Sequence, residues 1–135
     1  MLRTQTLAAE WAPRLSSVLR TVAALLFMAH GTQKLFGFPA LSASGQPALL
    51  SLLGLAGVLE LVGGGLLVVS LFTWPVAFML SGMMAVAYWL AHALRSASPL
   101  LNGGDAAVLY CFVFLYFAAA GGGAWSLDQR RGGTG

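Results

Sequence analysis

The chain has 135 residues, of which 59% are hydrophobic and 8% are charged, and its mean hydropathy is +0.83. Soluble domains carry about 25% charged residues, so this composition excludes a soluble globular protein and indicates a membrane protein. A bilayer-spanning helix needs about 20 residues, so four spans with short connections leave no room for a soluble catalytic domain. With one cysteine, Cys111, the chain has no intramolecular disulfide and no CxxC redox centre.

Residues 1–17 form a mixed, polar segment, which we expect to be an N-terminal tail. The first long apolar run follows, and it predicts a span over about residues 18–36 that ends before Pro39. A cleaved signal peptide is the alternative, because basic residues precede the apolar run and small residues follow at Ser42–Ser44. We expect the segment to be retained, because the side chains before that point make a poor cleavage context: Gln33, Lys34, Phe36 and Phe38.

The middle of the chain must be broken into separate helices. Residues 61–94 contain no charged side chain, and as one helix they would extend about 50 Å against a hydrocarbon thickness of about 30 Å. Pro75 suits the first positions of a helix and Trp74 suits the membrane interface, so the break is predicted there. A fourth span opens at Asp105, whose carboxylate favours the positive end of a helix, and ends at Gly121–Gly123. The predicted transmembrane domain is thus residues 18–121, with spans at about 18–36, 48–70, 75–94 and 105–120.

Positive charge is concentrated at the two ends of the chain. Five arginines lie in or beside the predicted tails together with two acids, Glu10 and Asp128, and these charges equal the whole net charge of +3. The positive-inside rule therefore places both tails, residues 1–17 and 122–135, in the cytoplasm, in agreement with an even number of spans. The predicted membrane part carries equal numbers of positive and negative side chains, so we expect charge pairs inside the bundle. Its charges are Lys34 and Arg95 against Glu60 and Asp105.

A polar stretch interrupts the first predicted span. On a helix, His30, Gln33 and Lys34 lie on one face, and such groups in a membrane usually face the bundle interior or a wet cavity. Glu60 lies about halfway along the second predicted span, and the glycines on its face permit close approach of another helix. The predicted topology brings these groups to the same half of the membrane as three further polar candidates: His92, Asn102 and Asp105.

Two interpretations of His30 and Glu60 remain open. A histidine and a glutamate at mid-membrane exchange protons or bind the carbonyl oxygens of a quinone-like ligand, whereas the alternative is an interhelical ion pair that fixes helix register. For His92 we favour an interfacial histidine bonded to a loop carbonyl over a ligand-binding group. A metal site is disfavoured, because the acidic and histidine residues match no dense ligand motif and Lys34 repels cations. No basic and aromatic pattern indicates nucleic-acid binding.

Several short segments distributed along the chain form a recognisable set. The most specific are His30–Gly37 and Leu101–Asp105. Further segments of the set are Arg20–Val22, Gly57–Gly64, Met83–His92 and Trp125–Asp128. In these segments the chain resembles the DoxX family of small four-span membrane proteins, over nearly its full length. The resemblance implies an all-α, four-transmembrane-helix bundle in the bacterial inner membrane.

The resemblance also implies a function. The family takes its name from similarity to the small subunit of an archaeal thiosulfate:quinone oxidoreductase, and some bacterial members are linked to membrane redox complexes and oxidative stress. We therefore expect a quinone-interacting, redox-linked subunit of a membrane oxidoreductase system in sulfur or oxidative-stress metabolism. In this hypothesis His30 and Glu60 exchange protons. The quinone, or another small lipophilic ligand, is held by Gln33, Lys34, His92, Asn102 and Asp105.

Electrons for such chemistry come from outside the chain. Redox-enzyme partner proteins are therefore expected in addition to the lipid bilayer, and a homo-oligomer is compatible with the sequence. Two alternatives remain open. In one, the protein is a non-enzymatic scaffold that recruits redox enzymes through its tails, and the polar cluster is structural. In the other, it is a small transporter or proton path that uses the same cluster.

Overall fold

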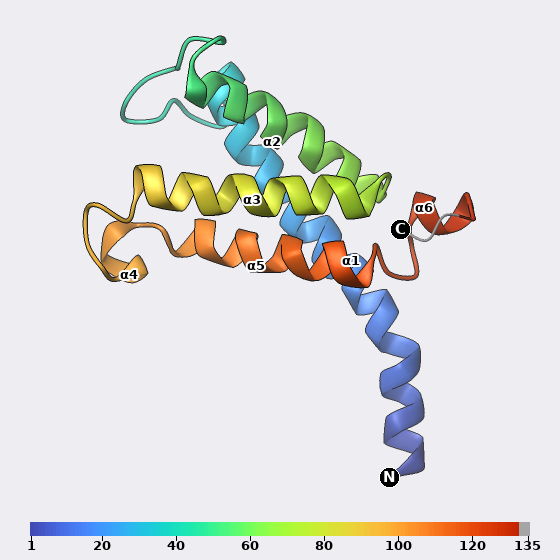
Figure 1. Cartoon of the computed structure of the whole chain (residues 1–135). Coiled ribbons are helices and arrows are strands. Elements are labelled where there is room, and N and C mark those ends of the chain that lie inside the picture. The colour runs from blue at the N-terminus through green and yellow to red at the C-terminus, as the bar shows by residue number, and fades with distance from the viewer. Residues whose placement is uncertain (133–135) are drawn as a thin grey trace.

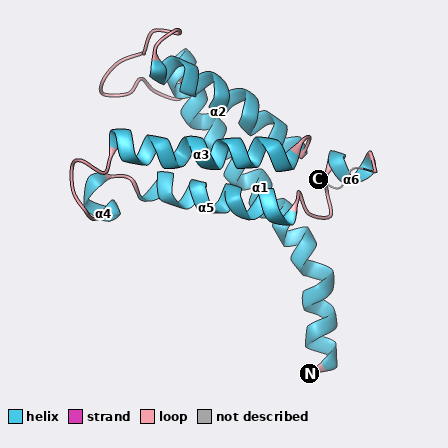
Figure 2. Ribbon diagram, viewed as in Figure 1, coloured by secondary structure: helices cyan, strands magenta, loops and turns pink. Residues whose placement is uncertain are grey.

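The computed structural model describes residues 1–132, and all regular elements within them are helices, which confirms the all-α prediction. Loops join these helices along the described chain (Figure 2). Residues 133–135, the end of the expected C-terminal tail, lie outside the described residues. The helices are α1 (Leu2–Phe36), α2 (Leu52–Val69), α3 (Thr73–Ala91), α4 (Pro99–Asn102), α5 (Asp105–Ala120) and α6 (Leu127–Arg130).

Three of the helices in the described chain, α1, α2 and α3, are long and apolar enough to cross a membrane. The fourth apolar helix, α5, has 16 residues and is shorter than these three. At 1.5 Å per residue it extends about 24 Å, against a hydrocarbon thickness of about 30 Å. The chain therefore folds as a membrane protein with three candidate spans and one shorter apolar helix.

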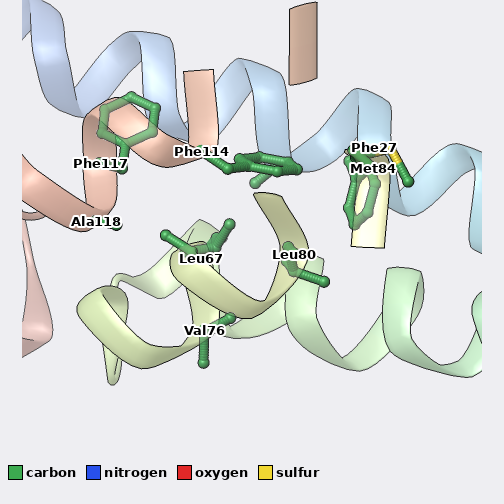
Figure 3. Close-up of a cluster of buried hydrophobic side chains, with 10 residues drawn as sticks. Phe27, Leu67, Val76, Leu80, Met84, Phe114, Phe117 and Ala118 are labelled. Carbon is green, nitrogen blue, oxygen red and sulfur yellow. The ribbon is translucent and has the colours of Figure 1, made fainter. Parts of the chain in front are cut away.

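The long helices pack in two pairs, α1 against α2 and α3 against α5. Figure 1 shows α3 and α5 side by side, with α1 crossing them at a steep angle. The core lies where the pairs meet, and Phe27 of α1 contacts Phe114 of α5 edge to face with ring centroids 4.9 Å apart. Leu67 of α2 and Leu80 of α3 complete this contact as fully buried side chains (Figure 3).

Helix α1 is longer than the first predicted span. It begins at Leu2, and Pro13 lies inside it without ending it. Residues 1–15 are exposed, and this part of α1 projects away from the other helices (Figure 1). A run of apolar residues predicts only the part of a helix that packs against other helices or contacts lipid. It therefore gives no sign that the helix continues into polar surroundings. The predicted tail is thus largely a helical extension.

The turn between α2 and α3 falls where the break was predicted. Ser70 and Phe72 both have left-handed backbone conformations, with φ of 56° and 53°, so the chain reverses within three residues. Thr73 begins α3, and its hydroxyl oxygen lies 2.6 Å from that of Ser70. This short turn holds one end of α2 against α3, and the loop at residues 37–51 and the connection at residues 92–104, which includes α4, both lie at the opposite end of the bundle (Figure 1).

Glycine permits the close approach of α1 and α2. A Cβ atom on Gly31 would lie 2.8 Å from the carbonyl oxygen of Gly57 and 2.9 Å from the amide nitrogen of Leu61. Both neighbours are backbone atoms, so only a residue without a side chain fits between them. The predicted contact of the Glu60 face with another helix is therefore present, and the partner is α1.

Candidate functional site

A cavity of about 330 Å³ lies between the two helix pairs. Side chains from α1, α2, α3 and α5 line it, and its walls are mainly apolar. Met83 and Met84 of α3 form part of the apolar lining, and Met84 is also a buried core residue. The polar side chains of the lining are His30, Lys34, Glu60, His92 and Tyr110.

Lys34 and Glu60 form an ion pair across the α1–α2 contact. Lys34 Nζ lies 2.5 Å from Glu60 Oε1, and the two side chains are 26% and 4% exposed. The prediction of a charge pair within the membrane part is confirmed for these two residues. Arg95 and Asp105, the other charges in that balance, form no ion pair within residues 1–132.

The second carboxylate oxygen of Glu60 is buried and has no hydrogen-bond partner within residues 1–132. A buried polar atom left without a partner costs about 1–3 kcal/mol. Glu60 lines the cavity, so a hydrogen-bond donor held there can reach this carboxylate. The ion pair with Lys34 therefore leaves one oxygen of Glu60 available as a hydrogen-bond acceptor.

His30 is exposed on α1 at the edge of the cavity. Its Nδ1 lies 3.0 Å from the carbonyl oxygen of Leu26, and since a carbonyl only accepts, Nδ1 carries the hydrogen. The ring also meets Tyr110 edge to face, with centroids 5.9 Å apart. The structure brings His30 and Glu60 to one cavity, but within residues 1–132 no hydrogen bond joins them. The partner of Glu60 is Lys34.

Tyr110 of α5 is a site residue that the sequence patterns did not single out. Its ring contacts Phe27 at 5.4 Å and Phe114 at 5.6 Å between centroids, which fixes it against the core. The face of α5 that carries Leu109, Phe112 and Tyr116 is exposed. The usable signal was the i, i+4, i+7 spacing of Tyr110, Phe114 and Phe117, which places them on one inward face.

Asn102 holds the loop between α3 and α5. It is buried, and its side-chain amide donates to Tyr88 Oη at 3.1 Å and to the Ser96 carbonyl at 2.9 Å. Its Oδ1 accepts from the Gly104 amide at 2.8 Å. His92 Nδ1 lies 3.1 Å from the Asn102 carbonyl oxygen, which is the loop-carbonyl bond favoured for this histidine. The side chain of Asn102 is thus committed to the loop, while His92 also lines the cavity.

The two remaining predicted ligand residues lie outside the cavity. Gln33 donates from Nε2 to the carbonyl of Ala40 at 3.2 Å, in the loop after α1. Asp105 is exposed, and its Oδ1 accepts from the Ala106 amide at 3.0 Å. The structure therefore gathers four of the predicted residues in the cavity, namely His30, Lys34, Glu60 and His92. Within residues 1–132 no group of three acidic, histidine or cysteine side chains is close enough to hold a metal ion.

A second polar network occupies the opposite end of the bundle and centres on Arg20. The sequence grouped Arg20 with the tail arginines, but its side chain is buried at 3% exposure. Its Nε donates to the Leu67 carbonyl at 2.8 Å, and its other nitrogens donate to the carbonyls of Gly122 and Trp125. Leu67 lies in the last turn of α2, where backbone carbonyls carry partial negative charge that suits a cation, and Gly122 and Trp125 lie in the segment between α5 and α6. Arg20 therefore joins the end of α2 to the segment after α5.

Comparison with known proteins agrees with this architecture. The DoxX family profile matches residues 15–93, which cover α1 from residue 15 onward and the whole of α2 and α3. An uncharacterized protein of Haemophilus influenzae is 41% identical over 125 residues, which is 90% of this chain and 93% of the relative. No solved structure matches the chain significantly. The profile match and this relative together show that the chain belongs to the DoxX family.

Proposed function

We propose that this DoxX membrane protein binds the head group of a quinone, or of a similar small lipophilic molecule, in the cavity between its helix pairs. The observation that carries the proposal is the buried, unpartnered oxygen of Glu60 beside Lys34 in a mainly apolar cavity. Small-molecule sites are typically apolar cavities of roughly 300–1,000 Å³ with a few convergent polar groups. A volume of about 330 Å³ suits one substituted ring, with the apolar tail left in the bilayer.

The cavity residues have distinct roles in this proposal. Lys34 donates a hydrogen bond to a ligand oxygen while it remains near Glu60. His30 and Glu60 take up or release protons, since both are titratable and both line the cavity. A bound quinone supplies redox chemistry, for which a partner protein or substrate provides the electrons. The protein would then be a redox-linked subunit of a membrane oxidoreductase system, in sulfur or oxidative-stress metabolism.

We further propose that the four apolar helices, α1, α2, α3 and the shorter α5, all cross the bacterial inner membrane and that both termini are cytoplasmic. Ser17 Oγ accepts a hydrogen bond from the Trp125 amide at 2.9 Å, so the start of the packed part of α1 and the end of α5 meet at one end of the bundle. An even number of crossings produces this arrangement. The arginines near both termini support a cytoplasmic position.

A non-enzymatic scaffold is the second candidate function, and the extension of α1 favours it. Leu7, Trp11 and Leu15 recur at helical spacing on this extension, and each is about half exposed. A projecting helix with an apolar stripe suits the recruitment of a redox enzyme or of a second copy of the chain. In that case Lys34 and Glu60 serve helix register alone.

Extraction of bound quinone tests the first proposal. The wild-type protein and the Glu60→Gln variant are purified in mild detergent, and quinone per protein is quantified after solvent extraction. Asp105→Asn is the matched control, because it removes a carboxylate that lies outside the cavity. Near-stoichiometric quinone in wild type and Asp105→Asn, with loss in a folded Glu60→Gln protein, supports the site. If well-folded wild-type protein binds no quinone even after quinone is added, the quinone-binding proposal is contradicted and the scaffold function remains.

A further inference from the structure

The cavity offers more hydrogen-bond acceptors than donors. Oε2 of Glu60 is an acceptor on a side chain that is 4% exposed, and it is unpartnered within residues 1–132. This oxygen is a strong acceptor when the carboxylate is charged, as its ion pair with Lys34 implies. A hydrogen-bond donor on an occupant of the cavity would satisfy this oxygen.

The two histidines add acceptors of the same kind. Nδ1 of His30 and Nδ1 of His92 each face a backbone carbonyl, at 3.0 and 3.1 Å. Each Nδ1 must carry a hydrogen to make that bond, so in the neutral ring the remaining nitrogen, Nε2, is an acceptor. Both side chains line the cavity. Backbone contacts thus set the tautomer of both rings.

Few donors balance these acceptors. Lys34 already donates to Glu60 Oε1 at 2.5 Å, which occupies part of its capacity. The Tyr110 hydroxyl both donates and accepts. An oxidised quinone has carbonyl oxygens, which accept and never donate, whereas its reduced hydroquinone carries two hydroxyl donors. The cavity therefore matches the hydroquinone better than the quinone.

We infer that the cavity is selective for the reduced form, a hydroquinone or an equivalent diphenol with its ring between the two helix pairs. This inference rests on the proposed function and adds the redox state of the ligand. The Glu60 carboxylate accepts from one hydroxyl, and an imidazole Nε2 accepts from the other. Because the hydroquinone satisfies the buried oxygen of Glu60 and the quinone does not, we expect the hydroquinone to bind roughly 10- to 100-fold more tightly than the quinone. Each tenfold preference raises the midpoint potential of the bound couple by about 30 mV, which favours electron uptake by the bound quinone.

Equilibrium binding of a matched redox pair tests the inference. A decyl-substituted benzoquinone and its hydroquinone are titrated anaerobically into the wild-type protein in detergent, with binding to empty micelles subtracted. The expected result is a hydroquinone dissociation constant at least about tenfold below that of the quinone. In Glu60→Gln the amide supplies a donor as well as an acceptor, and the ratio should fall towards one. Asp105→Asn, outside the cavity, should retain the wild-type ratio.

The outcomes separate this inference from the proposed function. Equal or tighter binding of the quinone to wild type overturns the redox selectivity and leaves a quinone site in place. If neither form binds to well-folded wild type, both proposals fail. His30→Leu is the second variant in case Glu60→Gln does not fold, because His30 is exposed and its replacement leaves the core intact. It should lower hydroquinone affinity more than quinone affinity, and unchanged affinities for both would remove His30 from the site.

Discussion

Asp128 lies 55 residues beyond Thr73 in the sequence, yet its Oδ2 accepts the Thr73 backbone amide at 2.8 Å. The other carboxylate oxygen accepts the amide of Phe72, also at 2.8 Å. Phe72 precedes α3 and has no side-chain group that could cap the helix, so a distant carboxylate takes that role. The segment after α5 is thereby attached to the turn between α2 and α3.

This contact predicts acid-sensitive stability. Burial raises the pKa of Asp128, but the backbone hydrogen bonds from Thr73 and Phe72, with help from the Thr73 hydroxyl and the Arg131 charge, outweigh burial and hold the pKa below its ordinary 3.8. A carboxyl whose pKa is lower in the folded state contributes stability above its ordinary pKa and loses that contribution as pH falls through the folded value. Asp128→Asn should therefore cost about 1–3 kcal/mol at neutral pH.

Thermal unfolding in detergent, followed by circular dichroism between pH 7 and about pH 3, measures this effect. The difference in melting temperature between wild type and Asp128→Asn should shrink as pH falls below 3.8, the ordinary pKa. Asp105→Asn is the control, because Asp105 is exposed and serves no other element. A difference between wild type and Asp128→Asn that stays constant down to the lowest pH would show that the charge of Asp128 has no role.

Arg20 should be among the most sensitive positions of the chain. Arg20→Met removes the donors of the Leu67, Gly122 and Trp125 carbonyls together, and we expect a loss of about 2–4 kcal/mol in unfolding free energy. Arg20→Lys keeps the positive charge but lacks the planar guanidinium group with its several N–H donors, so its stability should lie between those of wild type and Arg20→Met. Arg14→Met, on the exposed part of α1, should change stability by less than about 0.5 kcal/mol. Equal melting temperatures for Arg20→Met and Arg14→Met would contradict this assignment.

Much of the fold follows from local patterns in the sequence. The apolar runs indicate the helices, Pro75 marks the start of α3 within two residues, and the glycines beside Glu60 mark a helix contact. The face shared by His30 and Lys34 does line the bundle cavity. These features depend on spacing along one helix, which the sequence displays directly.

The parts that were missed depend on contacts between distant segments. Asn102 ends α4 and Asp105 begins α5 in the same polar stretch of the sequence, and only the packing of this stretch turns Asn102 inward and leaves Asp105 exposed. The rotation of α5 that brings Tyr110 to the cavity is set by Phe114 and Phe27. Arg20 resembles an interfacial arginine until the carbonyls of Leu67, near the end of α2, and of Gly122, in the segment after α5, are placed around it.

The Lys34–Glu60 pair gives a prediction about the cost of a buried carboxylate that has lost its cation. Lys34→Met leaves the Glu60 carboxylate buried without its cation, and we expect a loss of about 2–4 kcal/mol in unfolding free energy. The double variant Lys34→Met, Glu60→Gln removes the charge as well, so it should recover most of that stability. Melting temperatures of the single and double variants measure this coupling. A double variant no more stable than Lys34→Met would mean that the charge of Glu60 is not the source of the loss.

The close contact of α1 with α2 predicts that Gly31→Ala both destabilises the bundle and lowers the affinity of the cavity for its ligand. The new methyl would lie 2.8 Å from the Gly57 carbonyl oxygen, so the helices must separate, at a cost of about 1–3 kcal/mol. Separation of the two helices also moves Lys34 away from Glu60, so the affinity for the ligand should fall as well. Gly82→Ala is the matched control, because its Cβ meets nothing within 4 Å, and alanine there should stabilise α3 by up to about 1 kcal/mol. Unfolding temperatures and quinone titrations of both variants measure these effects. Equal unfolding temperatures and equal quinone affinities for Gly31→Ala and Gly82→Ala would exclude a tight α1–α2 contact as the basis of the site.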